Sequence, residues 1–182
     1  MSASNLFLKI SEIIKSDFRN SFIGGEIILK DSTSKPVKIN KTGGFLCIQP
    51  DKKIKDWKNN FPFFETSVNY LCSVADHIIF YPKQDTLFVF LIELKSNNPT
   101  DAMKQILANY ELGKYICGTV FRLLSYPESK IEYRGIIFSN RAFYKGNTKR
   151  KNNLYIEHNQ SKLKFQHFKT DSTYDLDVLC CD

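Results

Sequence analysis

Apolar residues at the start of the chain recur at helical spacing. Over residues 3–18, Leu6, Ile10, Ile13 and Ile14 fall within one arc of a helical wheel drawn at about 100° per residue. A stripe of this kind is typical of an amphipathic helix that docks on a core. We therefore expect a helix at the start of the chain.

A longer helical pattern covers residues 101–123. Turn-forming residues occupy positions 96–100, with Thr100 as the expected N-cap, and Tyr126 and Pro127 end the pattern. The pattern predicts a second, long helix. Its apolar side comprises Met103, Ile106, Leu107, Tyr110, Ile116 and Phe121.

Two strong strand patterns lie between these helices. Residues 75–81 and 86–95 are rich in Ile, Phe, Val and Leu, which favour β-strands. Because only residues 82–85 separate them, we predict an antiparallel hairpin with a four-residue connection. Further strands are predicted at residues 26–29, 44–48 and 131–138, and a second hairpin at 154–158 and 163–168.

The order of these elements predicts the fold class. A helix, antiparallel strands, a helix and a strand follow one another over residues 3–139, without a repeat or a long linker. Residues 140–182 are predicted to form a basic loop, a hairpin and an acidic tail. We therefore predict one α/β domain over residues 1–182, in which a core carries a basic C-terminal hairpin appendage.

The net charge of the chain lies in one segment. The 182 residues carry 26 Lys and Arg against 19 Asp and Glu, a surplus of +7. Residues 140–170 hold eight of the bases and a single acid, Glu157, so the rest of the chain balances at 18 against 18. A concentrated positive segment favours a polyanionic partner. The eight bases are Arg141, Lys145, Lys149, Arg150, Lys151, Lys162, Lys164 and Lys169.

Several classes of protein are disfavoured by the sequence. Its longest apolar run, residues 87–92, is far shorter than the roughly 20 residues that span a bilayer, so no membrane association is expected. Five cysteines without a Cys-x-x-Cys pair favour free thiols over disulfides or a structural zinc site. Neither a phosphate-binding glycine loop nor a secretory signal pattern is present, and we expect a cytoplasmic protein.

The first hairpin carries the strongest candidate for chemistry. Alternation places Glu93 and Lys95 at the end of an otherwise apolar face of its second strand. Burying charge is costly unless the charge is paired or bound to a metal, so this position calls for an explanation. Asp76 on the first strand is expected to meet Glu93 near the same end of the sheet.

Two carboxylates and an amine at one point suit metal-assisted hydrolysis. Hard oxygen ligands favour Mg²⁺ or Mn²⁺ between Asp76 and Glu93, with the Leu94 carbonyl as a further ligand. Such a cation lowers the pKa of a bound water and neutralises charge on a phosphoryl oxygen. Lys95 could orient that water or stabilise the transition state.

An acid followed two residues later by lysine is not informative by itself. The pattern begins at Asp51, Asp56, Glu93 and Glu128, and three of these lie in polar, turn-like surroundings. The one at Glu93 ends a strong strand, follows the hairpin and precedes the long helix. Context therefore selects Glu93 from the four.

In this context the chain resembles the PD-(D/E)XK nuclease superfamily, which has the restriction-endonuclease-like fold. The resemblance covers residues from about 3 to 138 and implies a core of helix, three antiparallel strands, helix and strand. It implies Asp76 and Glu93 as metal ligands and Lys95 as the catalytic lysine. Many members carry a glutamine in the following helix, often as Q-x-x-x-Y. Gln105 matches that glutamine, whereas Tyr110 lies one residue beyond the motif's tyrosine.

The resemblance has departures and one open position. Ala75 stands where the family motif has proline, and the literal Pro50-Asp51 lies outside the hairpin and is set aside. Many members also place an acid on the first helix. Three residues remain open for this additional acid: Glu12, Asp17 and Glu26.

The resemblance implies a metal-dependent nuclease that hydrolyses phosphodiester bonds, and we expect DNA as substrate in preference to RNA. Restriction, repair and anti-phage defence are compatible roles, for a homodimer or a subunit of a larger complex. The alternatives are a catalytically inactive nucleic-acid-binding module and an interaction subunit on the same fold. The residues expected to contact nucleic acid are Arg141, Lys145, Lys149, Arg150 and Lys151.

Overall fold

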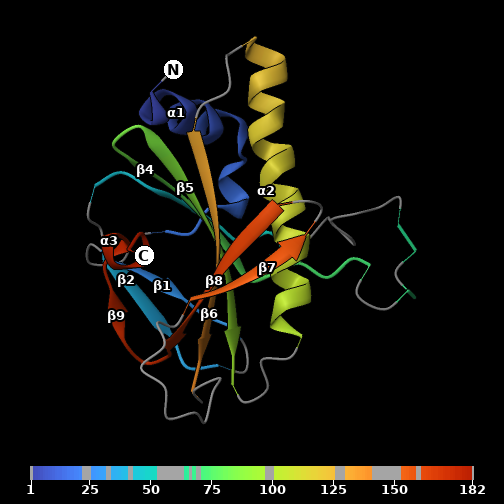
Figure 1. The fold of residues 1–182 in the computed structure, drawn as a ribbon, viewed down its shortest axis with the longest axis vertical. Helices are drawn as coiled ribbons and strands as arrows, with labels where there is room; N and C mark the ends of the chain where they lie inside the picture. The colour runs from blue at the N-terminus through green and yellow to red at the C-terminus, as the bar shows by residue number, and fades with distance from the viewer. Residues whose placement is uncertain are drawn as a thin grey trace.

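The protein is an α/β structure built on a six-stranded mixed sheet, shown by a computed structural model (Figure 1). The strand order is β3-β4-β5-β6-β8-β7. The bounds of these strands are β3 Leu46–Ile48, β4 His77–Lys83, β5 Thr86–Lys95, β6 Lys130–Ser139, β7 Asn153–His158 and β8 Ser161–Lys169. The structure describes residues 2–21, 26–31, 34–40, 43–52, 64–65, 67–68, 71–96, 101–125, 130–140, 153–158 and 161–181, with only the backbone described for 153–158 and 161–162.

The sheet has antiparallel pairs at both sides and parallel pairs in its middle, because β7 at the far side is antiparallel to β8. β3, β4 and β5 are antiparallel neighbours, whereas β6 runs parallel to β5 and β8 runs parallel to β6. The helix α2 (Ala102–Leu124) makes the crossover from β5 to β6 that a parallel pair requires. Consequently β5, β6 and β8 all end at the same edge of the sheet.

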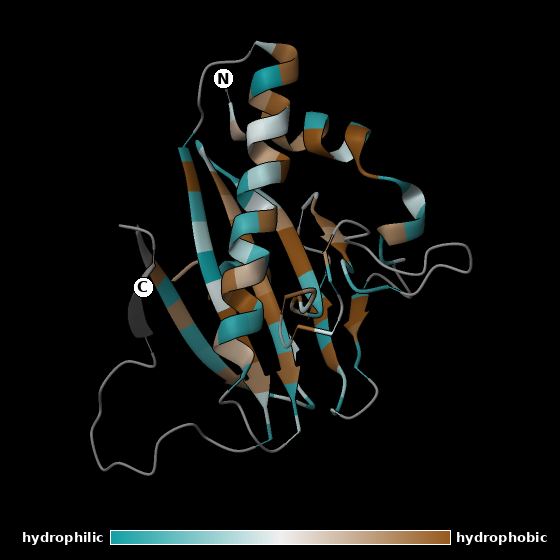
Figure 2. Ribbon diagram, turned by 90° about the vertical axis from the view of Figure 1, so that its right-hand side faces the viewer, coloured by the Kyte–Doolittle hydropathy of each residue, from teal (hydrophilic) through white to brown (hydrophobic). Residues whose placement is uncertain are grey.

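Two layers cover the sheet. The helices α1 (Ala3–Ile13) and α2 pack on one face through an apolar cluster that includes Leu6 and Ile106 (Figure 2). On the opposite face, Ile27 and Leu176 belong to a second cluster. That cluster lies under a small sheet and the helix α3. The bounds are β1 Glu26–Leu29, β2 Val37–Asn40, β9 Thr173–Tyr174 and α3 Leu176–Leu179.

The position of β5 in the middle of the fold explains why its sequence is so apolar. Leu87, Val89 and Leu91 join the cluster under the helices, whereas Phe88 and Phe90 join the cluster under the small sheet. A strand covered on both faces has no polar face, and its sequence becomes a continuous apolar run. Among the described residues, no helix combines the length and apolar character needed to cross a bilayer.

Several predicted boundaries differ from the structure. The hairpin connection is a two-residue turn, Gln84 and Asp85, rather than four residues. Gln84 adopts a positive φ of 52°, as tight hairpin turns require. Because the turn is this short, β4 continues through Lys83, which pairs with Thr86. The first helix ends at Ile13, because Ile14 is extended before the short 3₁₀-helix η1 (Ser16–Phe18). The N-cap of α2 is Asp101, and Thr100 lies outside the described residues.

The C-terminal region is part of the fold rather than an appendage. The hairpin β7–β8 extends the main sheet, because β8 pairs with β6 over residues 164–169 of β8. The acidic tail, for which no elements were predicted, forms β9 and α3. β9 pairs in parallel with β2, a strand that was also not predicted. The pairing partners of these short segments lie far away in sequence, which local patterns do not reveal.

Candidate active site

Asp76 and Glu93 lie side by side where β4 begins and β5 approaches its end. The pairing of His77 with Ile92 places these two residues next to each other. The backbone N–H of Asp76 donates to Oε2 of Glu93 at 3.2 Å, and the N–H of Leu94 donates to Oδ2 of Asp76 at 2.7 Å. Each carboxylate is therefore held by the backbone of the other strand.

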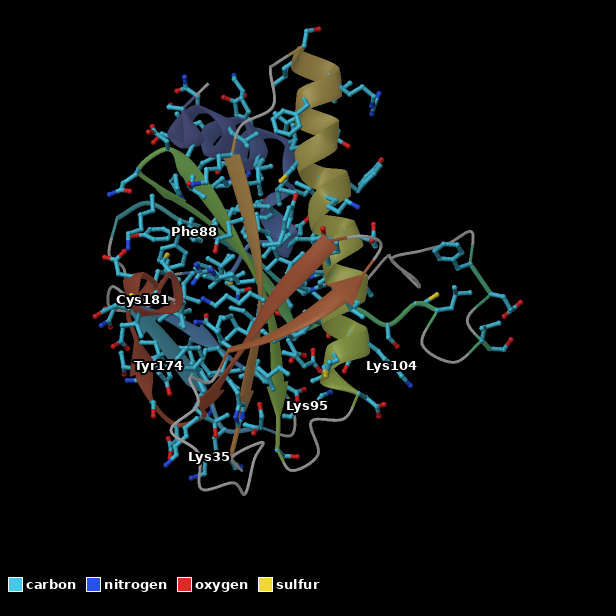
Figure 3. All side chains as sticks on the ribbon, in the orientation of Figure 1. Lys35, Phe88, Lys95, Lys104, Tyr174 and Cys181 are labelled. Carbon is cyan, nitrogen blue, oxygen red and sulfur yellow. The ribbon has the colours of Figure 1, made fainter. Side chains whose placement is uncertain are left out.

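Lys95 and Gln105 join this pair. The Lys95 Nζ lies 2.5 Å from Oε1 of Glu93 and donates to Oε1 of Gln105 at 2.7 Å. Gln105 comes from the start of α2, and its Nε2 donates to the carbonyl of Val74 at 3.4 Å. Figure 3 shows Lys95 at the end of β5, beside the first turns of α2. The four residues predicted to carry chemistry are thus in one connected group.

Burial gives the two acids unusual proton affinity. Glu93 is only 1% exposed, and burial raises its pKa to about 7, although Lys95 acts in the opposite direction. Burial, together with the negative charge of Glu93, raises the pKa of Asp76 to about 8. Two neighbouring carboxylates do not both ionise readily, which favours a shared proton near neutral pH.

Two more acids act on this pair, and neither was among the three candidates for the additional acid. The negative charges of Asp31 and Asp51 raise the pKa of Asp76. Asp31 follows β1 and Asp51 follows β3, so the two layers of the fold bring them to the site. Pro50-Asp51 was set aside because it lies outside the hairpin, and this electrostatic effect of Asp51 was not predicted. Asp31 could not be selected from the sequence, because the placement of β1 over the main sheet follows only from the tertiary structure.

The three candidates for the additional acid have other surroundings. Glu12 lies on the exposed side of α1 and pairs with Lys9 at 2.8 Å. Glu26 pairs with Lys38 of the neighbouring strand at 3.3 Å. Asp17 lies exposed in η1. None of the three is among the charges that shift the pKa of Asp76 or Glu93.

The donor set fits a hard cation with few protein ligands. Asp76 and Glu93 supply carboxylate oxygens, and burial is the main cause of the raised pKa values of both acids. Within the described part of the chain, no group of three or more His, Cys, Asp and Glu residues is arranged to hold a metal. Mg²⁺ commonly binds through one or two carboxylates and keeps several waters, which matches this site. The Leu94 backbone lies between the two acids, and its side chain is buried.

A second polar pair extends the same edge of the sheet. Ser139 is the register partner of Lys95, and its Oγ lies 2.8 Å from Nε2 of His167 on β8. Ser139 is buried, and His167 is half-buried. Sequence analysis did not select Ser139, because its position beside Lys95 follows from the parallel pairing of β5 and β6.

The residues expected to contact nucleic acid lie outside the described residues. They are Arg141, Lys145, Lys149, Arg150 and Lys151. The described chain reaches this segment from Ser139, the partner of Lys95, and resumes at Asn153, which pairs with Gln166. Gln166 in turn pairs with Ile136, three residues before Ser139. Both ends of the basic segment therefore join the sheet near the edge that carries the acids.

Comparison of the chain with protein-family models, with curated proteins and with solved structures gives no match.

Proposed function

We propose that this protein is a metal-dependent nuclease that hydrolyses phosphodiester bonds in nucleic acid, with DNA as the expected substrate. The observation that carries the proposal is the group formed by Asp76, Glu93 and Lys95. The carboxylate of buried Glu93 accepts from the Asp76 backbone, that of half-buried Asp76 accepts from the Leu94 backbone, both have raised pKa values, and an ammonium lies 2.5 Å from Glu93. Perturbed acids next to a lysine are characteristic of catalytic sites.

The residues of this group have separable roles in the proposed reaction. Asp76 and Glu93 would hold Mg²⁺ or Mn²⁺, with the Leu94 carbonyl as a further ligand. When bound, that cation supplies an activated water and charge neutralisation at the phosphoryl group. Lys95 is held by Gln105 as well as by Glu93, so its ammonium stays fixed at the site. From there it donates to the attacking water or to the phosphoryl oxygen on which charge develops.

The arrangement of elements supports a restriction-endonuclease-like core. When η1 and the strands β1 and β2 of the small sheet are left out, the order α1, β3, β4, β5, α2, β6 is a helix, three antiparallel strands, a helix and a parallel strand. The acids lie on the second and third of those strands or directly beside them, as the family pattern requires. In this proposal β8 and β7 are additions that widen the sheet beyond β6.

The charge distribution supports a polyanionic substrate. Five bases fall within residues 141–151, and the chain on either side of them joins the sheet near Lys95. A segment with this charge can attract a phosphate backbone. Its charge also predicts that binding weakens steeply as salt concentration rises.

A catalytically inactive nucleic-acid-binding module is the second candidate. The observation that favours it is the small number of ligands, since only two carboxylates meet within the described residues. A protein of this kind would bind nucleic acid without metal-stimulated cleavage. The same cleavage assay therefore separates the two candidates.

The test is cleavage of plasmid and single-stranded DNA in Mn²⁺ or Mg²⁺, with EDTA as the blank. We expect products with metal, none with EDTA, and a loss of at least about 100-fold in Lys95→Ala and Glu93→Gln. Lys104→Ala is the matched control, because Lys104 is an exposed lysine on the same helix as Gln105. Undiminished cleavage by Lys95→Ala would contradict the proposal, and binding without cleavage would favour the inactive module.

A further inference from the structure

A buried asparagine on α2 contacts the backbone that leads into Asp76. Asn109 is 0% exposed, and its Nδ2 donates to the carbonyl of Ala75 at 3.1 Å. Its Oδ1 is buried and has no hydrogen-bond partner among the residues that the structure describes. Asn109 was not selected from the sequence, because it lies where the Q-x-x-x-Y motif has tyrosine and asparagine does not match that motif.

Asn109 and Gln105 act on consecutive peptide groups. They are four residues apart on α2 and so lie on the same face of the helix. Gln105 donates to the carbonyl of Val74 and Asn109 donates to that of Ala75. The next residue, Asp76, donates its own N–H to Glu93. The segment 74–76 is therefore attached to α2 on one side and to β5 on the other.

This attachment closes a ring of contacts around the site. Gln105 accepts from Lys95, Lys95 pairs with Glu93, and Glu93 accepts from the backbone of Asp76. Segment 74–76 has no strand pairing of its own, since β4 begins at His77. Its position therefore depends on the bonds to β5 and on the two side chains of α2, of which Asn109 is fully buried.

The unpaired oxygen of Asn109 argues against a role in stability alone. A buried polar atom without a partner destabilises the fold, and a leucine of similar size would remove it. That leucine would leave the Ala75 carbonyl unpaired instead, so the number of unpaired buried acceptors would stay the same. What the leucine would lose is the directional bond that sets the Ala75 backbone.

We propose that Asn109 is a positioning residue that fixes the Asp76 carboxylate for cation binding. The inference rests on the proposed function, because it assigns Asp76 to a metal site. Residues that orient metal ligands without touching the metal typically change metal affinity or activity by about 10- to 100-fold when replaced. Because Asn109 is buried, it does not contact the nucleic acid.

The test compares Asn109→Leu with Val120→Ala, a core substitution on the same helix. Val120 is 1% exposed and belongs to the core cluster under the helices. For Asn109→Leu we expect Mn²⁺ affinity by calorimetry to fall about 10- to 100-fold, and kcat to fall with KM for DNA unchanged. Its urea midpoint should stay close to that of the wild type. Val120→Ala should show the reverse, a lower midpoint with unchanged Mn²⁺ affinity.

Three outcomes decide the inference. Unchanged Mn²⁺ affinity in a folded Asn109→Leu protein would overturn it and leave the proposed function intact. Should the leucine variant fail to fold, Asn109→Ala removes the same donor without adding volume, and the same criterion applies to it. A wild-type protein that binds no Mn²⁺ would overturn both proposals together.

Discussion

Replacing Asp76 with asparagine should stabilise the metal-free protein at alkaline pH while it abolishes metal binding. In the folded chain the pKa of Asp76 is raised from 3.8 to about 8, chiefly by burial. A carboxyl with a raised pKa favours folding below its ordinary pKa, and that contribution is lost as pH rises toward 8. The metal-free wild type should therefore lose stability between about pH 4 and pH 8.

The size of the effect follows from the same pKa. At about 1.4 kcal/mol per pH unit, ionising Asp76 in the folded chain costs on the order of 5 kcal/mol. Because Glu93 contributes to this shift, removing one acid recovers only part of the cost, and we expect about 2–3 kcal/mol at pH 8. The asparagine can still accept from the Leu94 N–H, so the backbone contact survives.

The assay is urea unfolding in EDTA at pH 5 and pH 8, with Asp177→Asn as the matched control. Asp177 is exposed and pairs with Lys83, which lowers its pKa. The control should lose at most about 1 kcal/mol and gain nothing at pH 8. Mn²⁺ at 100 times its dissociation constant should stabilise the wild type by about 2.7 kcal/mol and Asp76→Asn by nothing. Destabilisation of Asp76→Asn at pH 8 in EDTA would refute this reasoning.

Three further predictions concern packing, pH and the basic segment. Gly135→Ala should destabilise the fold by about 2–4 kcal/mol in thermal unfolding, because the added Cβ would lie 2.7 Å from the Phe165 ring. Gly118→Ala is the control: its Cβ would have no atom within 4 Å, and we expect it to stabilise α2 by about 1 kcal/mol. Mn²⁺ affinity should rise from pH 6 to pH 8, because the shared proton must leave Asp76 and Glu93 before the cation binds. Calorimetry in two buffers should detect the released proton. A pH-independent affinity would argue against these two acids as ligands. Neutralising the three bases at 149–151 should weaken DNA binding and reduce its salt slope by about one per lost phosphate contact, leaving Mn²⁺ affinity intact; an unchanged slope would remove the segment from the interface.

The sequence was informative where local pattern and tertiary role coincide. β5 was predicted from Thr86 to Lys95 and has those bounds, because a strand buried on both faces needs an uninterrupted apolar run. The charged residues that interrupt this run at its end were selected as candidate site residues for the same reason. In this part of the chain the same residues carry the burial pattern and the proposed chemistry.

Other parts of the site depend on contacts between distant segments. Asp31 acts on the acids because β1 packs over the main sheet, and this packing does not follow from the prediction of the strand itself. Asn109 matters through one bond to Ala75, 34 residues away in sequence. Ser139 neighbours Lys95 only because β6 pairs in parallel with β5 after the crossover through α2. Each of these three placements is a consequence of the assembled layers.

The most direct measurement is anomalous scattering from crystals soaked in Mn²⁺. We expect a peak between Asp76 and Glu93, about 2.0–2.2 Å from an oxygen of each carboxylate, with Lys95 adjacent to it. The Asp76→Asn protein soaked in the same way should show no peak there. The absence of a peak at this position in wild-type crystals at saturating Mn²⁺ would contradict the proposed metal site.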